Sequence, residues 1–125
     1  MKRIDVYFLL LATLLLLAGA GLGIKMGASE DFQLTPVHAH LNLVGWASLA
    51  LFGLTYRAYP QLAQKRLALF HFIVSASSAV LLPIGIGLAV LRNQPGLAIA
   101  ASLLWVLGVL LFLVQIFALL RTAES

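Results

Sequence analysis

Apolar residues fill four long stretches of the chain, and three short polar breaks separate them. The apolar stretches cover about 6–24, 36–56, 67–91 and 97–120. A helix needs roughly 20 apolar residues to cross a hydrocarbon core about 30 Å thick, so each stretch is long enough to span a membrane. The pattern predicts an all-α membrane protein whose residues 1–125 form a single four-transmembrane-helix bundle.

The composition narrows the class of protein further. Of the 125 residues, 62% are hydrophobic and 10% are charged, whereas a typical soluble domain has about 25% charged residues. This excludes a soluble globular enzyme and a disordered chain. The eight basic residues are scattered among apolar runs, so we expect a lipid bilayer and no nucleic acid as partner. The chain has no cysteine, which excludes a thiolate metal site and a thioether-linked haem.

The basic residues also orient the bundle, because cytoplasmic loops are enriched in Lys and Arg. If both termini are cytoplasmic, two basic residues lie outside, Lys25 and Arg92, and six lie inside: Lys2, Arg3, Arg57, Lys65, Arg66 and Arg121. We therefore expect an integral protein of a bacterial inner (cytoplasmic) membrane with both termini in the cytoplasm. The first 21 residues also resemble a secretory signal peptide. Their apolar run is longer than a typical signal core, so we expect the first span to be retained.

Polar residues at membrane depth gather at the start of the second stretch, toward the outer side. His38, His40 and Asn42 lie within five residues, and such groups are costly in a membrane unless they have partners. Residues two apart on an α-helix differ by about 200°, so the two histidines point to opposite faces. They cannot chelate one metal ion from a regular helix, and each must turn to a different neighbour.

Haem iron is the metal that best suits this pair. Neutral imidazole binds iron or copper, and an apolar cleft without thiolates or carboxylates favours haem b over copper. Gly45 leaves room for a flat ligand, Trp46 contributes to the apolar cleft, and Asn42 shares the face of His38. The predicted cofactor-binding residues are His38, His40, Asn42, Gly45 and Trp46, with His38 and His40 as metal ligands and no catalytic residue assigned.

His71, in the third stretch, lies too deep on the other side to join the same iron site. It is four residues into its span from the cytoplasmic end, and the helical rise places it roughly 18 Å in axial height from His40. We expect His71 to be an interfacial or hydrogen-bonded histidine. A proton-relay role is the alternative.

One segment of the second stretch resembles a helix of a known family. The segment consists of His38-Ala39-His40 followed by Gly45, Gly53, Tyr56 and Pro60. It is similar to the tenth transmembrane helix of subunit I of the haem-copper oxidases, a superfamily that includes the nitric oxide reductases. There the first histidine ligates the high-spin haem and the second the low-spin haem. The resemblance implies the same split between His38 and His40, and it implies that the chain corresponds to the last four-helix third of that subunit.

The chain also departs from that family. The second axial histidine of the low-spin haem and the three copper-binding histidines come from helices that have no counterpart here, and the cross-linked tyrosine has no obvious counterpart. Oxygen reduction by this chain alone is therefore not expected, and whether the protein is an enzyme stays open.

Three classes of function fit a small four-span protein. The first is a b-type haem protein for electron transfer or for binding NO or O₂, with a respiratory-chain electron donor as partner. The second is a cofactor-free accessory or assembly subunit of a respiratory complex. The third is a small multidrug-type transporter, which should carry a carboxylate inside the membrane. It ranks last because all four acidic residues fall at span ends or in loops: Asp5, Glu30, Asp31 and Glu124.

The opposite directions of His38 and His40 also predict an oligomer. At least one of them must leave its own bundle, and an unpaired imidazole facing lipid is costly. A closed ring of identical chains lets one face of each protomer meet the other face of the next. We expect a homotrimer with haem at the subunit interfaces, ahead of a dimer or a hetero-complex.

Overall fold

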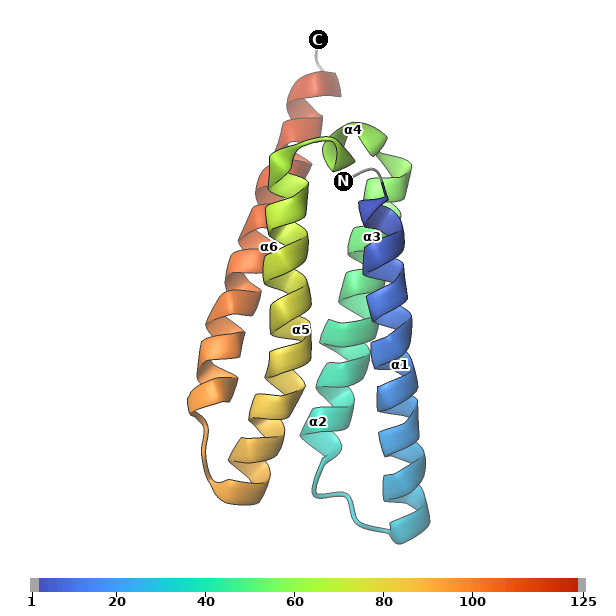
Figure 1. Ribbon diagram of the computed structural model, residues 1–125, viewed down its shortest axis with the longest axis vertical. Coiled ribbons are helices and arrows are strands. Elements are labelled where there is room, and N and C mark those ends of the chain that lie inside the picture. Colours follow the sequence, from blue (N-terminus) through green and yellow to red (C-terminus); the bar gives the residue numbers. More distant parts are fainter. Residues whose placement is uncertain (1–2, 124–125) are drawn as a thin grey trace.

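The computed structural model describes residues 3–123, and all of its regular structure is helical. The elements are α1 (Ile4–Ser29), α2 (Thr35–His40), the π-helix η1 (Leu41–Ser48), α3 (Leu49–Ala58), α4 (Pro60–Ala63), α5 (Arg66–Arg92) and α6 (Gly96–Ala123). Three of them, α2, η1 and α3, run on as one rod (Figure 1). Four helical segments in this part of the chain are therefore long and apolar enough to cross a membrane. This confirms the all-α, four-span prediction, and the protein is an integral membrane protein.

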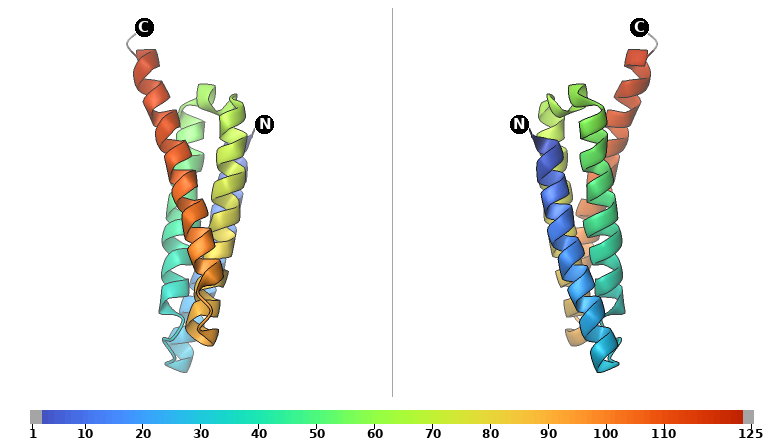
Figure 2. Two further views of the ribbon diagram at one scale, coloured as in Figure 1. Left: turned by 90° about the vertical axis from the view of Figure 1, so that its left-hand side faces the viewer. Right: turned by 90° about the vertical axis from the view of Figure 1, so that its right-hand side faces the viewer.

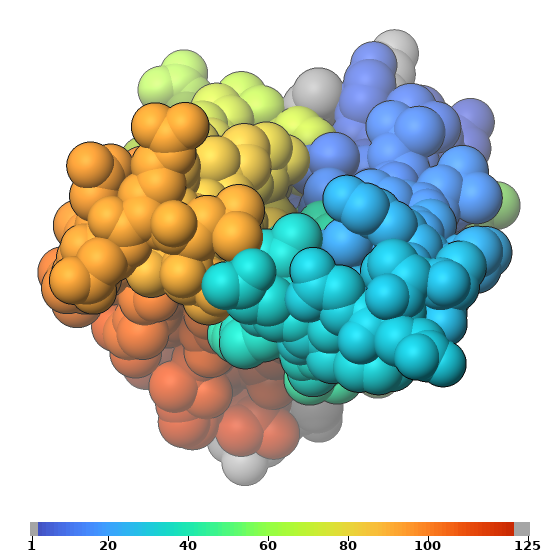
Figure 3. Space-filling model, turned by 90° about the horizontal axis from the view of Figure 1, so that it is seen from below, coloured from blue at the N-terminus to red at the C-terminus, as the bar shows by residue number. Residues whose placement is uncertain are grey.

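The four rods alternate in direction, and both chain ends lie at the same end of the bundle. The N-terminus, α4 and the C-terminus lie together at the top in Figure 1. Figure 2 shows α6 crossing the others at a slant and projecting beyond them at that end. Seen from below, the opposite end consists of the α1–α2 connection in cyan and the α5–α6 connection in orange (Figure 3). This arrangement agrees with the prediction that both termini share one side of the membrane.

Local sequence explains where the helices end. Glu30 after α1 and Asn93 after α5 both have φ of 54°, the left-handed conformation that commonly terminates a helix. Pro36 and Pro60 occupy the first turns of α2 and α4, where the missing N–H has no intrahelical acceptor anyway. At every end, the helical segment extends one to five residues beyond the apolar stretch from which it was predicted.

Glycines set the closest approaches between rods. A Cβ built on Gly85 of α5 would lie 2.5 Å from the backbone nitrogen of Ala98, so α5 and α6 touch backbone to backbone near their connection. Further along α6, toward the C-terminus, a Cβ on Gly108 would lie 2.6 Å from Oγ of Ser75. Small residues at such points are the usual way for membrane helices to approach closely.

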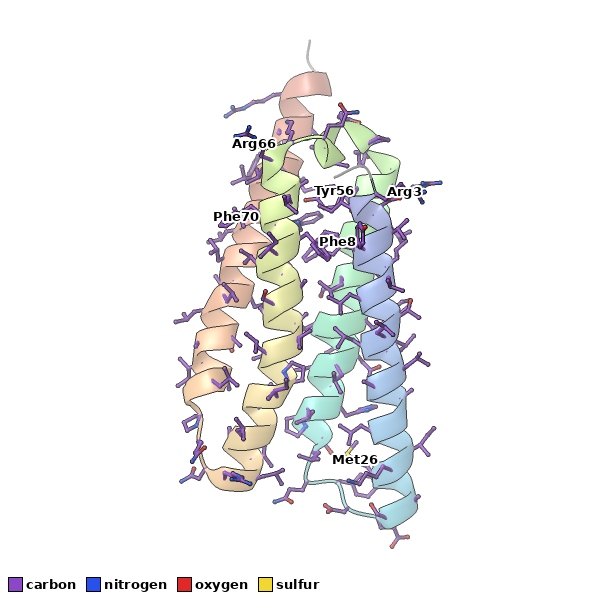
Figure 4. The ribbon with its side chains drawn as sticks, viewed as in Figure 1. Arg3, Phe8, Met26, Tyr56, Arg66 and Phe70 are labelled. Carbon is purple, nitrogen blue, oxygen red and sulfur yellow. The ribbon has the colours of Figure 1, made fainter. Side chains whose placement is uncertain are left out.

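The buried core lies toward the end of the bundle that carries the chain termini. Figure 4 shows Phe8 of α1 and Tyr56 of α3 directed into the space between their helices and α5, whereas Phe70 points away from the bundle. Phe8 is fully buried, and its ring packs against the rings of Phe52, Tyr56, His71 and Phe72. Large apolar side chains also cover much of the outer surface, as expected for a protein that faces lipid.

Candidate functional site

His38 lies half-buried between the second span and α1. Its Nδ1 is 2.8 Å from the backbone oxygen of Gly19. Because a carbonyl oxygen can only accept, Nδ1 carries the hydrogen and Nε2 keeps its lone pair. Gly23, one turn further along α1, makes room for the ring, since a Cβ there would lie 2.8 Å from Cε1 of His38. The imidazole therefore occupies a notch in α1 formed by two glycines.

Asn42 closes the same notch from one turn later in the second span. Its Nδ2 donates to the backbone oxygen of His38 at 2.8 Å. The amide rests on Gly19, where a Cβ would lie 2.8 Å from Nδ2. Its Nδ2 is also 3.4 Å from Nδ1 of His38. Since both atoms carry hydrogen, that contact is no hydrogen bond. Asn42 thus supports the backbone and the position of His38.

His40 makes no such contact with α1. Its Nδ1 donates to the backbone oxygen of Pro36, one turn earlier in its own helix, at 2.7 Å. Nε2 of His40 again keeps the lone pair. Within residues 3–123, neither His38 nor His40 has a hydrogen-bond partner at Nε2. The two rings are therefore held through one nitrogen and have the other available.

Gly45 and Trp46 lie on different surfaces of the second span. Gly45 is buried against α1, and a Cβ there would lie 2.9 Å from Cβ of Leu15, so that side chain occupies the space above the glycine. Trp46 is half-buried and lines an open apolar hollow of about 500 Å³ together with Leu9, Ala47, Ala50, Leu51 and Leu54. Of the five predicted residues, the structure brings His38 and Asn42 together and leaves His40 and Trp46 on other parts of the helix surface.

The π-helix η1 begins directly after His40 and was not predicted. Gly45 and Gly53 both face α1, although a regular α-helix would rotate them about 80° apart over eight residues. The wider turns of η1 make up that difference, since each closes a ring with one more residue. A π segment often marks a functional part of a helix, and this one begins directly after the histidine pair.

A second polar group lies in the core, at the other end of the second span. Nδ1 of His71 is 2.8 Å from the hydroxyl of Tyr56, and Nε2 of Gln115 donates to the same hydroxyl at 2.5 Å. All three side chains are buried, and His71 is completely so. His71 is thus hydrogen-bonded, one of the two positions expected for it, and it lies inside the bundle and not at an interface.

Aromatic rings enclose this cluster, and part of its hydrogen-bonding capacity is unused. His71 packs against the rings of Phe8, Phe52 and Phe112, at centroid distances of 5.3, 4.7 and 5.5 Å. Among the described residues, three buried polar atoms have no hydrogen-bond partner: His71 Nε2, Ser75 Oγ and Gln115 Oε1. Such groups are costly to bury, which makes the cluster a second candidate for function.

Sequence reasoning missed the partners of His71. The sequence pattern did not single out Gln115, and it brought in Tyr56 only as part of the resemblance of the second stretch. The signal was present, because an amide at membrane depth needs a partner as much as an imidazole does. Spacing along one chain could not show that α3, α5 and α6 bring the three groups to one point.

Comparisons with protein-family models, curated proteins and solved structures give no match.

Proposed function

We propose that this four-helix membrane protein is a b-type haem protein in which His38 and His40 ligate haem iron through Nε2. The observation that carries the proposal is the hydrogen bonding of the two rings. Each donates its Nδ1 hydrogen to a backbone carbonyl, at 2.8 Å for His38 and 2.7 Å for His40. Histidines that bind metal usually donate their other ring nitrogen to a carbonyl or carboxylate, which fixes the ring and the tautomer.

The surroundings favour haem over a bare metal ion. No three His, Cys, Asp or Glu side chains come together as a metal site within residues 3–123. A metal held by these histidines must therefore bring most of its own ligands, as iron in a porphyrin does. The apolar hollow beside Trp46 offers a surface of the right character for a macrocycle. The resemblance of the His38–His40 segment to the His-x-His helix of the haem-copper oxidases supports the same ligands.

Bound haem would supply one-electron chemistry, and an open axial position would add binding of NO or O₂. The chain itself would hold and orient the iron through His38 and His40. The glycine notch of α1 and the amide of Asn42 keep His38 in position, and the apolar helix surface keeps water away. Two histidine ligands suit electron transfer, so a respiratory-chain electron donor is the partner that we propose.

The divergent histidines also support our proposal of a closed homo-oligomer, preferably a trimer with the site toward the outer side of a bacterial inner membrane. His38 is turned to α1 and His40 is held within its own helix, so one chain does not present both to a single iron. In a ring, His38 of one chain could meet His40 of the next across a haem. Their axial offset of about 3 Å is small enough for helix tilt to absorb.

An optical spectrum of the protein purified after expression with ample haem tests the proposal. We expect a Soret band, a reduced α-band and a pyridine haemochrome of the b type. His38→Ala and His40→Ala should each lose or alter the spectrum, whereas the control His71→Gln should keep it. A colourless wild-type protein would overturn the haem reading. Native mass spectrometry with haem counted per chain tests the trimer, and a haem-loaded monomer would contradict it.

One observation favours a second candidate, a cofactor-free accessory subunit of a respiratory complex. The Nδ1 hydrogen bond of His38 joins the second span to α1, which is a sufficient structural reason for the residue. This candidate predicts a colourless protein in which His38→Ala lowers stability and His40→Ala has little effect.

A further inference from the structure

A charged hollow opens at the end of the bundle where the chain termini lie. It has a volume of about 230 Å³, and its lining includes Asp5, Arg57, Ala63 and Gln64. In the liquid each water molecule takes about 30 Å³, so the hollow has room for several. Under the orientation set by the basic residues, it faces the cytoplasm.

An ion pair lies beside this hollow at the membrane boundary. The carboxylate of Asp5 is 3.2 Å from Nη1 of Arg57 and 3.7 Å from Nε of Arg3. The side chain of Asp5 is 11% exposed, while those of Arg57 and Arg3 are 68% and 63% exposed. Figure 4 shows Arg3 at the same level as Tyr56. Charged groups of both signs at this depth keep the hollow polar and favour water inside it.

Tyr56 separates the hollow from the buried cluster. Tyr56 is one of the residues that line the hollow, yet only 2% of it is exposed. On its other side its hydroxyl is 2.8 Å from Nδ1 of His71. Tyr56 therefore stands between a hollow with room for several water molecules and a fully buried imidazole.

The hydrogen bonds of the cluster have a direction. Nε2 of Gln115 can only donate, so the oxygen of Tyr56 accepts from it. The hydroxyl hydrogen of Tyr56 is then free to donate to Nδ1 of His71. His71 consequently carries its hydrogen on Nε2, which has no partner among the described residues. The phenol oxygen still has a second lone pair for a donor on the side of the hollow.

Among the described residues, Tyr56 is the one ionisable side chain in contact with the imidazole. From α1 the imidazole contacts Phe8, from the second span Phe52 and Tyr56, and from α6 Phe112. The charged residues that line the hollow are Arg3, Asp5 and Arg57. Within residues 3–123, the hydrogen bond from Tyr56 is the one route by which a proton can pass to His71.

We propose that the hollow, Tyr56 and His71 form a proton-uptake path from the cytoplasmic water into the core of the bundle. A hydronium ion in the hollow donates a proton to the oxygen of Tyr56 while the hydroxyl proton of Tyr56 moves to Nδ1 of His71. The phenol stays neutral, the hydronium ion becomes water, and the imidazole becomes imidazolium. The reverse transfer releases the proton. The path uses none of the residues that we assign to haem, so it holds or fails independently of that proposal.

A pH-jump experiment on the full-length protein in micelles tests this path. Histidine labelled with ¹³C in the ring separates imidazole bands from those of carboxyl groups in time-resolved infrared difference spectra. The band that is missing in His71→Gln belongs to His71. After a jump to acid, formation of the His71 imidazolium should be at least tenfold slower in Tyr56→Phe than in the wild type. The control Tyr59→Phe removes an exposed hydroxyl at the same helix end and should leave the rate unchanged.

The direction of the effect separates a relay from a merely structural hydrogen bond. Loss of a structural bond loosens the core and lets water in, so protonation in Tyr56→Phe as fast as in the wild type, or faster, would overturn the proposal. Failure of the wild-type His71 to protonate while the bundle stays folded would also overturn it.

A second variant decides the matter if Tyr56→Phe does not fold. Ala63→Leu narrows the hollow and leaves the two hydrogen bonds of the cluster intact. We expect it to slow the protonation of His71, whereas Ala58→Leu, on the exposed surface of the same end, should not. An unchanged rate in Ala63→Leu would contradict uptake through the hollow.

Discussion

The notch that holds His38 can be filled by a single methyl group. In Gly23→Ala the new Cβ would lie 2.8 Å from Cε1 and 3.2 Å from Nδ1 of His38. Carbon atoms pack best at about 3.5–4.0 Å, so the ring must move by roughly 0.7 Å or more. That displacement strains or breaks the hydrogen bond from Nδ1 to the backbone oxygen of Gly19, which is 2.8 Å long.

The expected loss of stability follows from three contributions. Overpacking a fitted site costs about 1–3 kcal/mol. A hydrogen bond between membrane helices contributes about 0.6 kcal/mol on average. Replacement of glycine by alanine inside a helix returns about 1 kcal/mol. On these values Gly23→Ala lowers the free energy of unfolding by roughly 0.6–2.6 kcal/mol. The control Gly21→Ala lies two residues away on α1, and no atom lies within 4 Å of its Cβ. It should therefore show only the gain of about 1 kcal/mol in the free energy of unfolding that alanine brings to a helix.

Titration of both variants with SDS in mixed micelles, followed by circular dichroism, measures the difference. Two more proteins, His38→Ala and the double variant His38→Ala with Gly23→Ala, complete a double-mutant cycle with Gly23→Ala and the wild type. Alanine at 23 should cost little once the imidazole is gone. Equal stability of Gly23→Ala and Gly21→Ala would refute the notch. So would an unchanged cost of Gly23→Ala in the His38→Ala background.

Two further stability predictions concern the contact of α5 with α6. Gly85→Ala should lower the free energy of unfolding by at least about 1–3 kcal/mol, since its Cβ would lie 2.5 Å from the backbone nitrogen of Ala98, which cannot turn aside. In the same SDS titration Gly87→Ala should be neutral or stabilising, because its nearest neighbour would lie at 3.8 Å. Ser75→Ala should raise stability by about 1 kcal/mol, since it removes a buried hydroxyl that has no partner among the described residues. A clear loss of stability in Ser75→Ala would show that this hydroxyl has a partner after all.

The sequence was sufficient for the spans because the bilayer imposes a simple rule on length and polarity. Four apolar stretches between polar breaks became four spans, and the excess of basic residues at one end agrees with termini on the same side. That the side chains of His38 and His40 turn to different neighbours was also predictable, because neighbouring residues on one helix have fixed relative directions. The structure turns His38 to α1, while His40 stays hydrogen-bonded within its own helix.

The contacts between different helices could not be predicted from the sequence. The notch for His38 depends on the axial position of α1 relative to the second span, which places Gly19 and Gly23 opposite the ring. The cluster around His71 forms only because α3, α5 and α6 hold Tyr56, His71 and Gln115 at the same height in the bundle, and that height does not follow from the sequence. The π turns of η1 carry no residue signature, since a Leu–Asn–Leu–Val–Gly–Trp segment is equally suited to an α-helix.

The eight residues of η1 link two chemically different halves of one span. Because each of its turns holds an additional residue, the segment turns less than an α-helix of the same length. If it adopted α-geometry with all of its residues kept, the histidine pair would rotate by about 80° relative to Phe52 and Tyr56. Either His38 would leave its notch in α1 or Tyr56 would leave His71. Loss of one residue together with the π turns would reduce that rotation to about 20°. In evolution, the π turns should therefore disappear together with one residue of this segment, whereas an outward side chain such as Leu43, which is 65% exposed, should vary freely.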